Sequence, residues 1–253
     1  MPAYIRHLGL IDIRSYAAVD VDLEPGVTSF VGPNGQGKTN LVEAVGYLST
    51  LSSHRVATDA PLLRSGCARG LIRADVVRDD RPLTIEVEIN AGAANKARIN
   101  RSPVPRTREI LGILRTVFFA PEDLSLVKGD PADRRAFLDD LLVQRQPRIS
   151  GVRADYDRVL KQRNALLKSA GVARRAHADE VSRTLEVWDE QLASLGSEIT
   201  CARADLIARL QPWALRSYAE LAKGGPELTL AYRPSVEVDA DRKSTRLNSS
   251  HAN

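Results

Sequence analysis

One segment of the sequence combines residue types and spacing that bind phosphate. It fits the pattern G-x-x-x-x-G-K-[ST], the P-loop. Its glycines let the backbone turn successive N–H groups toward a phosphate, Lys38 reaches the β- and γ-phosphates, and Thr39 places its hydroxyl on Mg²⁺. The segment therefore predicts an ATP site that uses Mg²⁺, formed by Gly32, Pro33, Asn34, Gly35, Gln36, Gly37, Lys38 and Thr39.

The flanks of this segment match the context that a P-loop needs. Val27, Phe30 and Val31 precede it and predict a short buried strand. After it, apolar residues recur at helical spacing between Leu41 and Leu48. The N-terminus of that helix adds partial positive charge at the phosphates. An ordinary glycine-rich turn before a helix is the alternative, and pattern and context together favour the P-loop.

Composition limits the class of protein. The chain has 253 residues, 43% of them hydrophobic and 27% charged, which is typical of a globular protein. No apolar run has the about 20 residues of a membrane span, and the N-terminus has no signal-peptide pattern. Cys67 and Cys201 are isolated, which favours reduced thiols in a cytoplasmic protein. The net charge of +4 permits a polyanionic partner without requiring one.

Alternation of apolar and polar residues predicts an N-terminal β unit that supports the P-loop. The expected strands are 4–13, 19–23, 71–77, 83–89 and 96–101. A helix at 108–114 and a strand at 116–120 should follow. Asp130, Pro131 and Asp133 are typical of a helix start, and the helix should continue through Leu142.

The character of the sequence changes near residue 150. Apolar residues there step by four and three, as in the seam of a coiled coil. Two such helices joined by a short polar link predict an antiparallel helical hairpin, an arm; two ordinary amphipathic helices on a core are the alternative. Pro212 is expected to break the second helix. The seam of that helix consists of Val181, Leu185, Trp188, Leu192, Leu195, Ile199, Ala202 and Leu206.

The predicted domains follow from these patterns. Residues 1–148 should form the N-terminal part of an ATPase lobe and 149–225 the helical arm. Residues 226–240 should return to the lobe as strands. Residues 241–253 have almost no apolar content, so we expect a disordered or non-native tail.

Several segments together resemble the RecF family, whose members are SMC-like ABC ATPases of DNA repair. The resemblance covers residues 4 to about 240. It implies an α/β fold, in which an ABC-type ATPase lobe with a mixed sheet and an antiparallel β subunit carries the helical arm. The segments are Tyr4–Leu8, Arg14–Tyr16, Gly32–Leu41, Ser52–Arg55, Phe119–Leu124, Val127–Arg135 and Phe137–Asp139.

The resemblance also implies a function. RecF-like proteins bind ATP and both single- and double-stranded DNA, and they form homodimers around ATP. They act with RecO and RecR to load RecA at gaps in DNA repair, replication and the SOS response. No membrane partner is implied.

The chain departs from the family pattern in one respect. Walker B and the signature loop follow the arm in this family, and neither is present here, so we interpret the chain as an N-terminal fragment that does not hydrolyse ATP. Ala136–Leu141 imitates Walker B, but its spacing predicts a helix. Glu122 or Asp123 could sense the γ-phosphate or Mg²⁺, or simply cap a turn.

Contact with DNA would need clustered cations on the surface. Each candidate could equally lie on an ordinary solvated face, and none would specify a base sequence. Two other functions remain: the nucleotide-binding subunit of a transporter, and a structural coiled-coil fragment whose P-loop supports no hydrolysis. The DNA-binding candidates are Arg55, Lys96, Arg98, Arg101, Arg106 and Arg108.

Overall fold

The computed structural model describes residues 3–170, 178–222 and 224–235. The chain divides into two compact units, Met1–Pro147 and Arg148–Asn253. Each unit has its own secondary structure, strands and short helices in the first and two long helices in the second.

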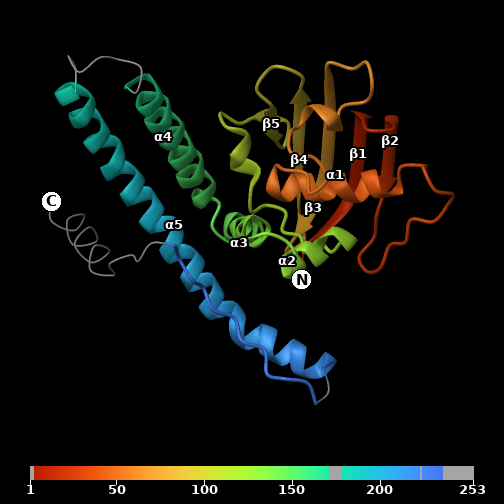
Figure 1. Ribbon diagram of the computed structural model, residues 1–253. Helices are drawn as coiled ribbons and strands as arrows, with labels where there is room; N and C mark the ends of the chain where they lie inside the picture. Colours follow the sequence, from red (N-terminus) through yellow and green to blue (C-terminus); the bar gives the residue numbers. More distant parts are fainter. Residues whose placement is uncertain (1–2, 171–177, 223, 236–253) are drawn as a thin grey trace. The chain divides into compact units, whose positions relative to one another are not determined.

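An antiparallel sheet is the centre of the first unit (Figure 1). Its order is β2-β1-β3-β4-β5-β6, so β2 and β6 are its edges. The five longer strands match the expected ones to within a few residues, because their alternating pattern gives each strand one buried face. The strands are β1 (Tyr4–Ile13), β2 (Tyr16–Asp22), β3 (Arg69–Arg78), β4 (Arg81–Asn90), β5 (Lys96–Ile99) and β6 (Ser102–Pro103).

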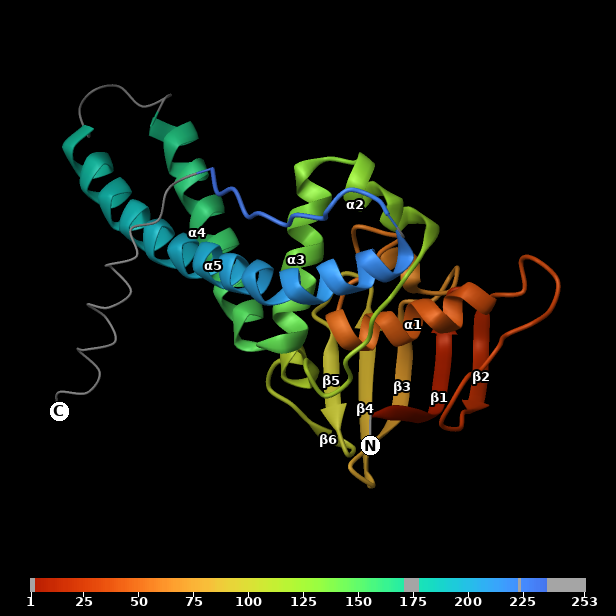
Figure 2. The same cartoon turned by 90° about the horizontal axis from the view of Figure 1, so that it is seen from below.

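Helix α1 (Lys38–Thr50) covers one face of this sheet, as Figures 1 and 2 show from two directions. Its Tyr47 and Leu48 are buried with Leu8 and Leu10 of β1 and with Ile85 of β4 in one hydrophobic core. This packing fixes the N-terminus of α1, and therefore the P-loop, relative to the sheet.

The first unit has one further short helix between α1 and β3 and a series of helices after β6. Helix α3 starts at the predicted position with a capping box, in which the Asp133 carboxylate accepts the Asp130 N–H at 3.2 Å. The helix expected at 108–114 is wrong beyond residue 110, since Gly112 has φ of 80° and cannot continue a helix. The elements are η1 (Ala60–Leu62), η2 (Thr107–Ile110), η3 (Pro121–Leu124), α2 (Ser125–Lys128) and α3 (Pro131–Arg145).

The strand expected before the P-loop and the one expected at 116–120 are not formed, and the segment expected to return as strands at 226–240 has no strand over 226–235. The rest of that segment and the expected tail at 241–253 lie outside the described residues. Val27 and Val31 are 98% and 88% exposed, and Val117 and Phe119 are 97% and 85% exposed. A strand needs a neighbour for its backbone hydrogen bonds. In the described part of the chain, no strand pairs with these segments. Val27, Val31, Val117 and Phe119 therefore remain in solvent, while Phe30 packs on the core and Ala120 is buried.

The second unit consists of α4 (Arg148–Ala170) and α5 (Ala178–Leu221), which pack on each other as the predicted antiparallel hairpin. Val159 of α4 and Ile199 of α5 are buried, and Leu206 of the predicted seam is buried further along α5. The break expected at Pro212 is wrong, because α5 continues to residue 221. A proline removes one backbone hydrogen bond and bends a long helix more readily than it ends one. Val181 belongs to the predicted seam, but its side chain lies outside the described residues.

Truncation of the seam should destabilise the hairpin. Ile199 is 6% exposed, so Ile199→Ala should lower the free energy of unfolding of this unit by about 2–4 kcal/mol. Val187→Ala is the matched control, because Val187 is also β-branched, lies on the same helix and is 55% exposed. Thermal melting followed by circular dichroism measures both. Equal effects of the two changes would contradict a packed seam.

Candidate nucleotide-binding site

The P-loop has the backbone conformation that phosphate binding needs. Gly32, Gly35 and Gly37 have φ angles of 148°, 82° and 88°, a range that side chains disfavour. Gly37 is the N-cap of α1, and no side chain caps the helix. The Asn40 N–H donates to the Gly37 carbonyl oxygen at 2.8 Å. The amide groups of Lys38 and Thr39 at the very start of the helix are the ones that could meet an anion, and the helix dipole favours negative charge there.

Lys38 lies over the loop that it would use to hold phosphate. Its Nζ donates hydrogen bonds to the carbonyl oxygens of Gly32 at 2.7 Å and Pro33 at 2.6 Å. These contacts hold the ammonium group above the loop, where it can exchange carbonyl partners for phosphate oxygens. Thr39 follows in the first turn of α1 and is exposed, so its hydroxyl is accessible to a Mg²⁺ ion.

The turn between β1 and β2 supports the loop from one side. The Tyr16 hydroxyl donates to the Gln36 carbonyl oxygen at 3.3 Å, and Asn40 Nδ2 donates to Ser15 Oγ at 3.0 Å. A Cβ atom on Gly37 would lie 2.5 Å from Ser15 Oγ. Gly37 is thus required twice, by its positive φ and by the close approach of this turn.

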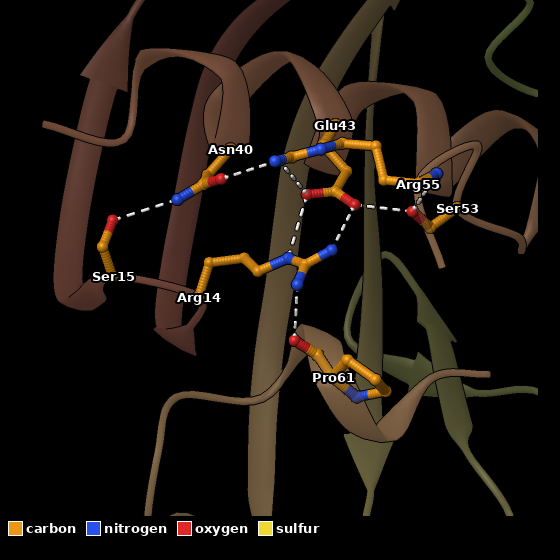
Figure 3. A network of polar contacts seen from close by, with 7 residues as sticks. All are labelled: Arg14, Ser15, Asn40, Glu43, Ser53, Arg55 and Pro61. Carbon is orange, nitrogen blue, oxygen red and sulfur yellow. Dashed lines mark hydrogen bonds and ion pairs between the residues drawn. The ribbon is translucent and has the colours of Figure 1, made fainter. Parts of the chain in front are cut away.

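A buried carboxylate ties three segments around α1 together (Figure 3). Glu43 is 2% exposed. Its two oxygens accept hydrogen bonds from Arg14 Nε at 3.0 Å and Nη2 at 2.7 Å, and one also accepts from Ser53 Oγ at 2.5 Å. Arg55 Nη1 lies 3.3 Å from the same carboxylate and 3.2 Å from Asn40 Oδ1.

The charge of Glu43 is stabilised by these partners. Burial alone would raise the pKa of Glu43, but the hydrogen bonds from Arg14 and Ser53 and the two positive charges outweigh it, and the pKa lies below its ordinary value. Arg14 also donates to the Pro61 carbonyl oxygen at 2.8 Å. The network therefore joins the β1–β2 turn, helix α1 and the loop after α1 into one support for the P-loop.

Sequence reasoning missed Arg14 and Glu43 as members of the site. Glu43 precedes Tyr47 by one helical turn, so it falls on the buried face of α1 that Tyr47 shares. A glutamate on such a face requires a cationic partner. The position of Glu43 on the apolar face of the predicted helix could therefore have indicated a buried ion pair. Nothing in the linear sequence shows that Arg14 is that partner, because β1 and β2 must form first.

The six predicted DNA-binding side chains fall into two groups. Arg55 belongs to the Glu43 network beside the P-loop. The other five lie on β5, in the following turn, at the N-cap of η2 and within η2. Within that group, Lys96 lies 3.9 Å from Glu88, and Arg98 lies 4.0 Å from Glu86 and 3.9 Å from Glu88. Glutamates of β4 therefore compensate the charges of β5.

The remaining three cations of this group are less compensated. Among the described residues, no ion pair involves Arg101, Arg106 or Arg108. Arg101 and Arg106 are exposed and Arg108 is half-buried. These three are the better placed of the predicted candidates for contact with a polyanion.

The acidic candidates outside the P-loop have local roles. The Asp123 carboxylate accepts the Ala120 N–H at 2.6 Å, which is the turn-capping role, while the Glu122 side chain lies outside the described residues. Ala136–Leu141 lies within α3, as its spacing predicts. Across the part of the chain that the structure describes, no group of three or more His, Cys, Asp or Glu side chains could hold a metal, and no helix is long and apolar enough to cross a membrane.

The fold and the P-loop define a nucleotide-binding protein of the AAA class, since residues 7–165 match the family described as AAA domain. The chain is 59% identical over 238 residues to a protein of Streptomyces avermitilis described as DNA replication and repair protein RecF. The match covers 94% of this chain and 64% of that protein. RecF of Beutenbergia cavernae is 57% identical over 237 residues, covering 92% and 60%. The chain belongs to the RecF family, as its motifs indicated.

Solved structures agree with this assignment. The structure described as the recombination mediator protein RecF-ATPrS in the RecFOR pathway has a TM-score of 0.79 at 27% identity and covers 87% of this chain and 58% of that one. The RecF-ATP structure has a TM-score of 0.84 at 24% identity, covering 99% and 67%. The likeness confirms the predicted fold class. The chain spans between 60% and 64% of the length of the two RecF relatives.

Loss of the Glu43 carboxylate should destabilise the first unit. Glu43→Gln leaves Arg14 poorly paired in a half-buried position, which should cost about 3 kcal/mol near neutral pH. Because the pKa of Glu43 is depressed in the folded chain, its contribution is complete above the ordinary value of 4.5 and decreases as pH falls below it. The difference between the variant and the wild type should therefore shrink below pH 4.5.

Urea unfolding of both chains at several pH values measures this difference. Glu86→Gln is the control, since Glu86 is a less buried glutamate whose nearest arginines lie 3.8 and 4.0 Å away. A pH-independent difference for Glu43→Gln would show that the network does not contribute as an ion pair.

Proposed function

We propose that this chain binds ATP with Mg²⁺ through residues 32–39. The observation that supports the proposal most directly is the conformation of the loop, in which three glycines with positive φ lead into an uncapped helix N-terminus beneath Lys38. The loop amides and Lys38 would hold the phosphates, and the Thr39 hydroxyl would bind Mg²⁺. A bound Mg²⁺ would neutralise charge on the β- and γ-phosphates.

We also propose that hydrolysis needs more of the protein than this chain contains. Walker B and the signature loop have no counterpart in the sequence, and the chain spans under two thirds of its RecF relatives. The exposed segments at 27–31 and 116–120 support the same proposal. Their apolar side chains are suited to a sheet that the remaining third of a full-length protein would complete. An ATP-dependent homodimer would supply the opposing half of the site.

For the whole protein we propose ATP-dependent, sequence-independent binding of single- and double-stranded DNA. The role would be recombinational repair and replication in the cytoplasm, loading RecA with RecO- and RecR-like mediators and supporting the SOS response. Membership of the RecF family supports this role. Arg101, Arg106 and Arg108 are the proposed phosphate contacts, with Lys96, Arg98 and Arg55 as weaker candidates because glutamates compensate them.

Two alternatives are less well supported. A transporter subunit is disfavoured by the helical hairpin of α4 and α5 and by the RecF relatives. The second alternative is that the 253-residue chain has a P-loop but does not hydrolyse ATP. This alternative is compatible with the proposed role of the longer protein.

Substitution in the P-loop should weaken ATP binding by this chain. Lys38→Ala removes the charge over the loop and should weaken ATP binding at least tenfold, about 1.4 kcal/mol. Gly37→Ala should do the same, because the new Cβ would meet Ser15 and Tyr16. Gly66→Ala is its control, as Gly66 has φ of 83° but no neighbour within 4 Å of the added Cβ. Calorimetry with ATP and Mg²⁺ measures binding.

Hydrolysis is measured in the same samples. Release of phosphate by the purified chain should stay at background. Steady turnover that Lys38→Ala abolishes would refute the proposal that the hydrolytic residues lie outside this chain.

DNA binding is predicted for the chain extended to the length of its relatives. Replacing Arg101, Arg106 and Arg108 together by Ala should weaken binding to gapped DNA in all sequence contexts. If the three side chains contact phosphates, the negative slope of log K against log[salt] should become shallower by about 2–3, since each duplex phosphate contributes about 0.9 to its magnitude. Fluorescence anisotropy at several salt concentrations measures this slope. An unchanged slope in the triple variant would exclude these residues as phosphate contacts.

A further inference from the structure

A second group of basic residues lies at the turn of the β3–β4 hairpin. Arg78 ends β3 and Arg81 begins β4, and the two residues are cross-strand partners in the register of the sheet. The turn between them contains Asp79 and Asp80, both with positive φ. Like charges directly opposite each other in a sheet destabilise it, so this pair carries a cost that an anionic partner would remove.

A groove adjoins this arginine pair. Its volume is about 880 Å³, and Arg78, Arg81 and Arg115 contribute to its lining together with one acidic residue, Asp79. Asp79 lies 3.8 Å from Arg78 and offsets part of its charge. In the described part of the chain, neither Arg81 nor Arg115 takes part in an ion pair, and both side chains are exposed. The groove is therefore positively charged.

The rest of the lining is aliphatic. Val76 and Leu111 are buried at 1% and 5% exposure, and Leu83 and Ile113 are half-buried. None of the described residues that line the groove is aromatic. The groove thus combines an apolar surface with arginines, and its volume lies within the range of about 300–1,000 Å³ that is usual for ligand sites.

This combination favours one kind of occupant. Single-stranded nucleic acid is usually bound by stacking its bases on aromatic side chains, which the lining lacks, and phosphate contacts to a duplex need no aliphatic surface. A peptide with acidic residues beside an apolar side chain satisfies both parts of the groove. Both β3 and β4 already have neighbours on each side, so recognition would use side chains and not an added strand.

We propose that the groove between the β3–β4 hairpin and residues 111–115 binds an acidic peptide segment of a partner protein, with an apolar side chain of that segment against Leu83, Leu111 and Ile113. Arg81 and Arg115 pair with its carboxylates. The site is separate in composition from the P-loop and does not depend on nucleotide binding or on the proposed role in DNA repair.

Selection from a random peptide display library on the purified chain tests the proposal. The enriched peptides should carry Asp or Glu next to Leu, Ile, Met or Phe. A labelled peptide from this selection should bind about tenfold more weakly to Arg81→Ala and to Arg115→Ala, as expected for an interface hot spot. Arg101→Ala, which removes an exposed arginine from another turn, should bind as the wild type does. Binding should also weaken as salt increases.

Two controls separate this result from other causes. Arg81→Ala removes like-charge repulsion, so its thermal midpoint should not fall, and lost binding cannot then be attributed to unfolding. Labelled oligothymidylate is titrated in parallel. The proposal is wrong if no peptide is enriched, if enriched peptides lack acidic residues, or if Arg101→Ala weakens binding equally. It is also wrong if oligothymidylate displaces the peptide and itself depends on Arg81 and Arg115, because the groove would then be a nucleic-acid surface.

Discussion

The geometry of the nucleotide site depends on one buried ion-pair network, centred on Glu43. A carboxylate that is 2% exposed is stable only if its charge is matched, and Arg14, Ser53 and Arg55 match it from two other segments. Since Glu43 lies one helical turn after the P-loop, the same contacts that satisfy its charge hold α1 against the β1–β2 turn. The β1–β2 turn also lies so close to position 37 that only glycine fits there. The contacts that stabilise the first unit therefore also fix the C-terminal side of the P-loop.

Two segments without strand partners show which features the local sequence pattern does not determine. Residues 27–31 and 116–120 have the composition of buried strands, yet Val27 and Val117 are 98% and 97% exposed. Their side chains favour a strand, but a strand also needs a neighbour for its backbone, and none of the described strands pairs with these segments. The P-loop is thus held firmly on its C-terminal side, by α1 and the Glu43 network, and lacks strand pairing on its N-terminal side.

Elements that depend on contacts near in sequence were predictable. The strands β1 to β5, helix α1 and the capping box of α3 follow from alternation, helical spacing and short-range capping. Features that depend on distant contacts were not: Arg14, the partner of Glu43, comes from the β1–β2 turn, 29 residues away along the chain. Pro212 shows a related difficulty, because a proline's effect on a helix depends on the length of helix on either side. The same limit applies to Lys96 and Arg98, whose glutamate partners become visible only in the register of β4 and β5.

The distribution of charge separates two kinds of basic surface on this chain. On β5 the cations lie 3.9 to 4.0 Å from glutamates of β4. Their charge therefore stabilises the sheet and is largely neutralised by these glutamates. At the end of the β3–β4 hairpin, arginines face each other, and a single lining aspartate offsets only part of their charge. Counting Lys and Arg along the sequence cannot distinguish these cases, because cross-strand register decides which cations are compensated. Uncompensated arginines beside a buried aliphatic surface are the arrangement that an acidic partner would complete, and this arrangement lies within the first unit alone.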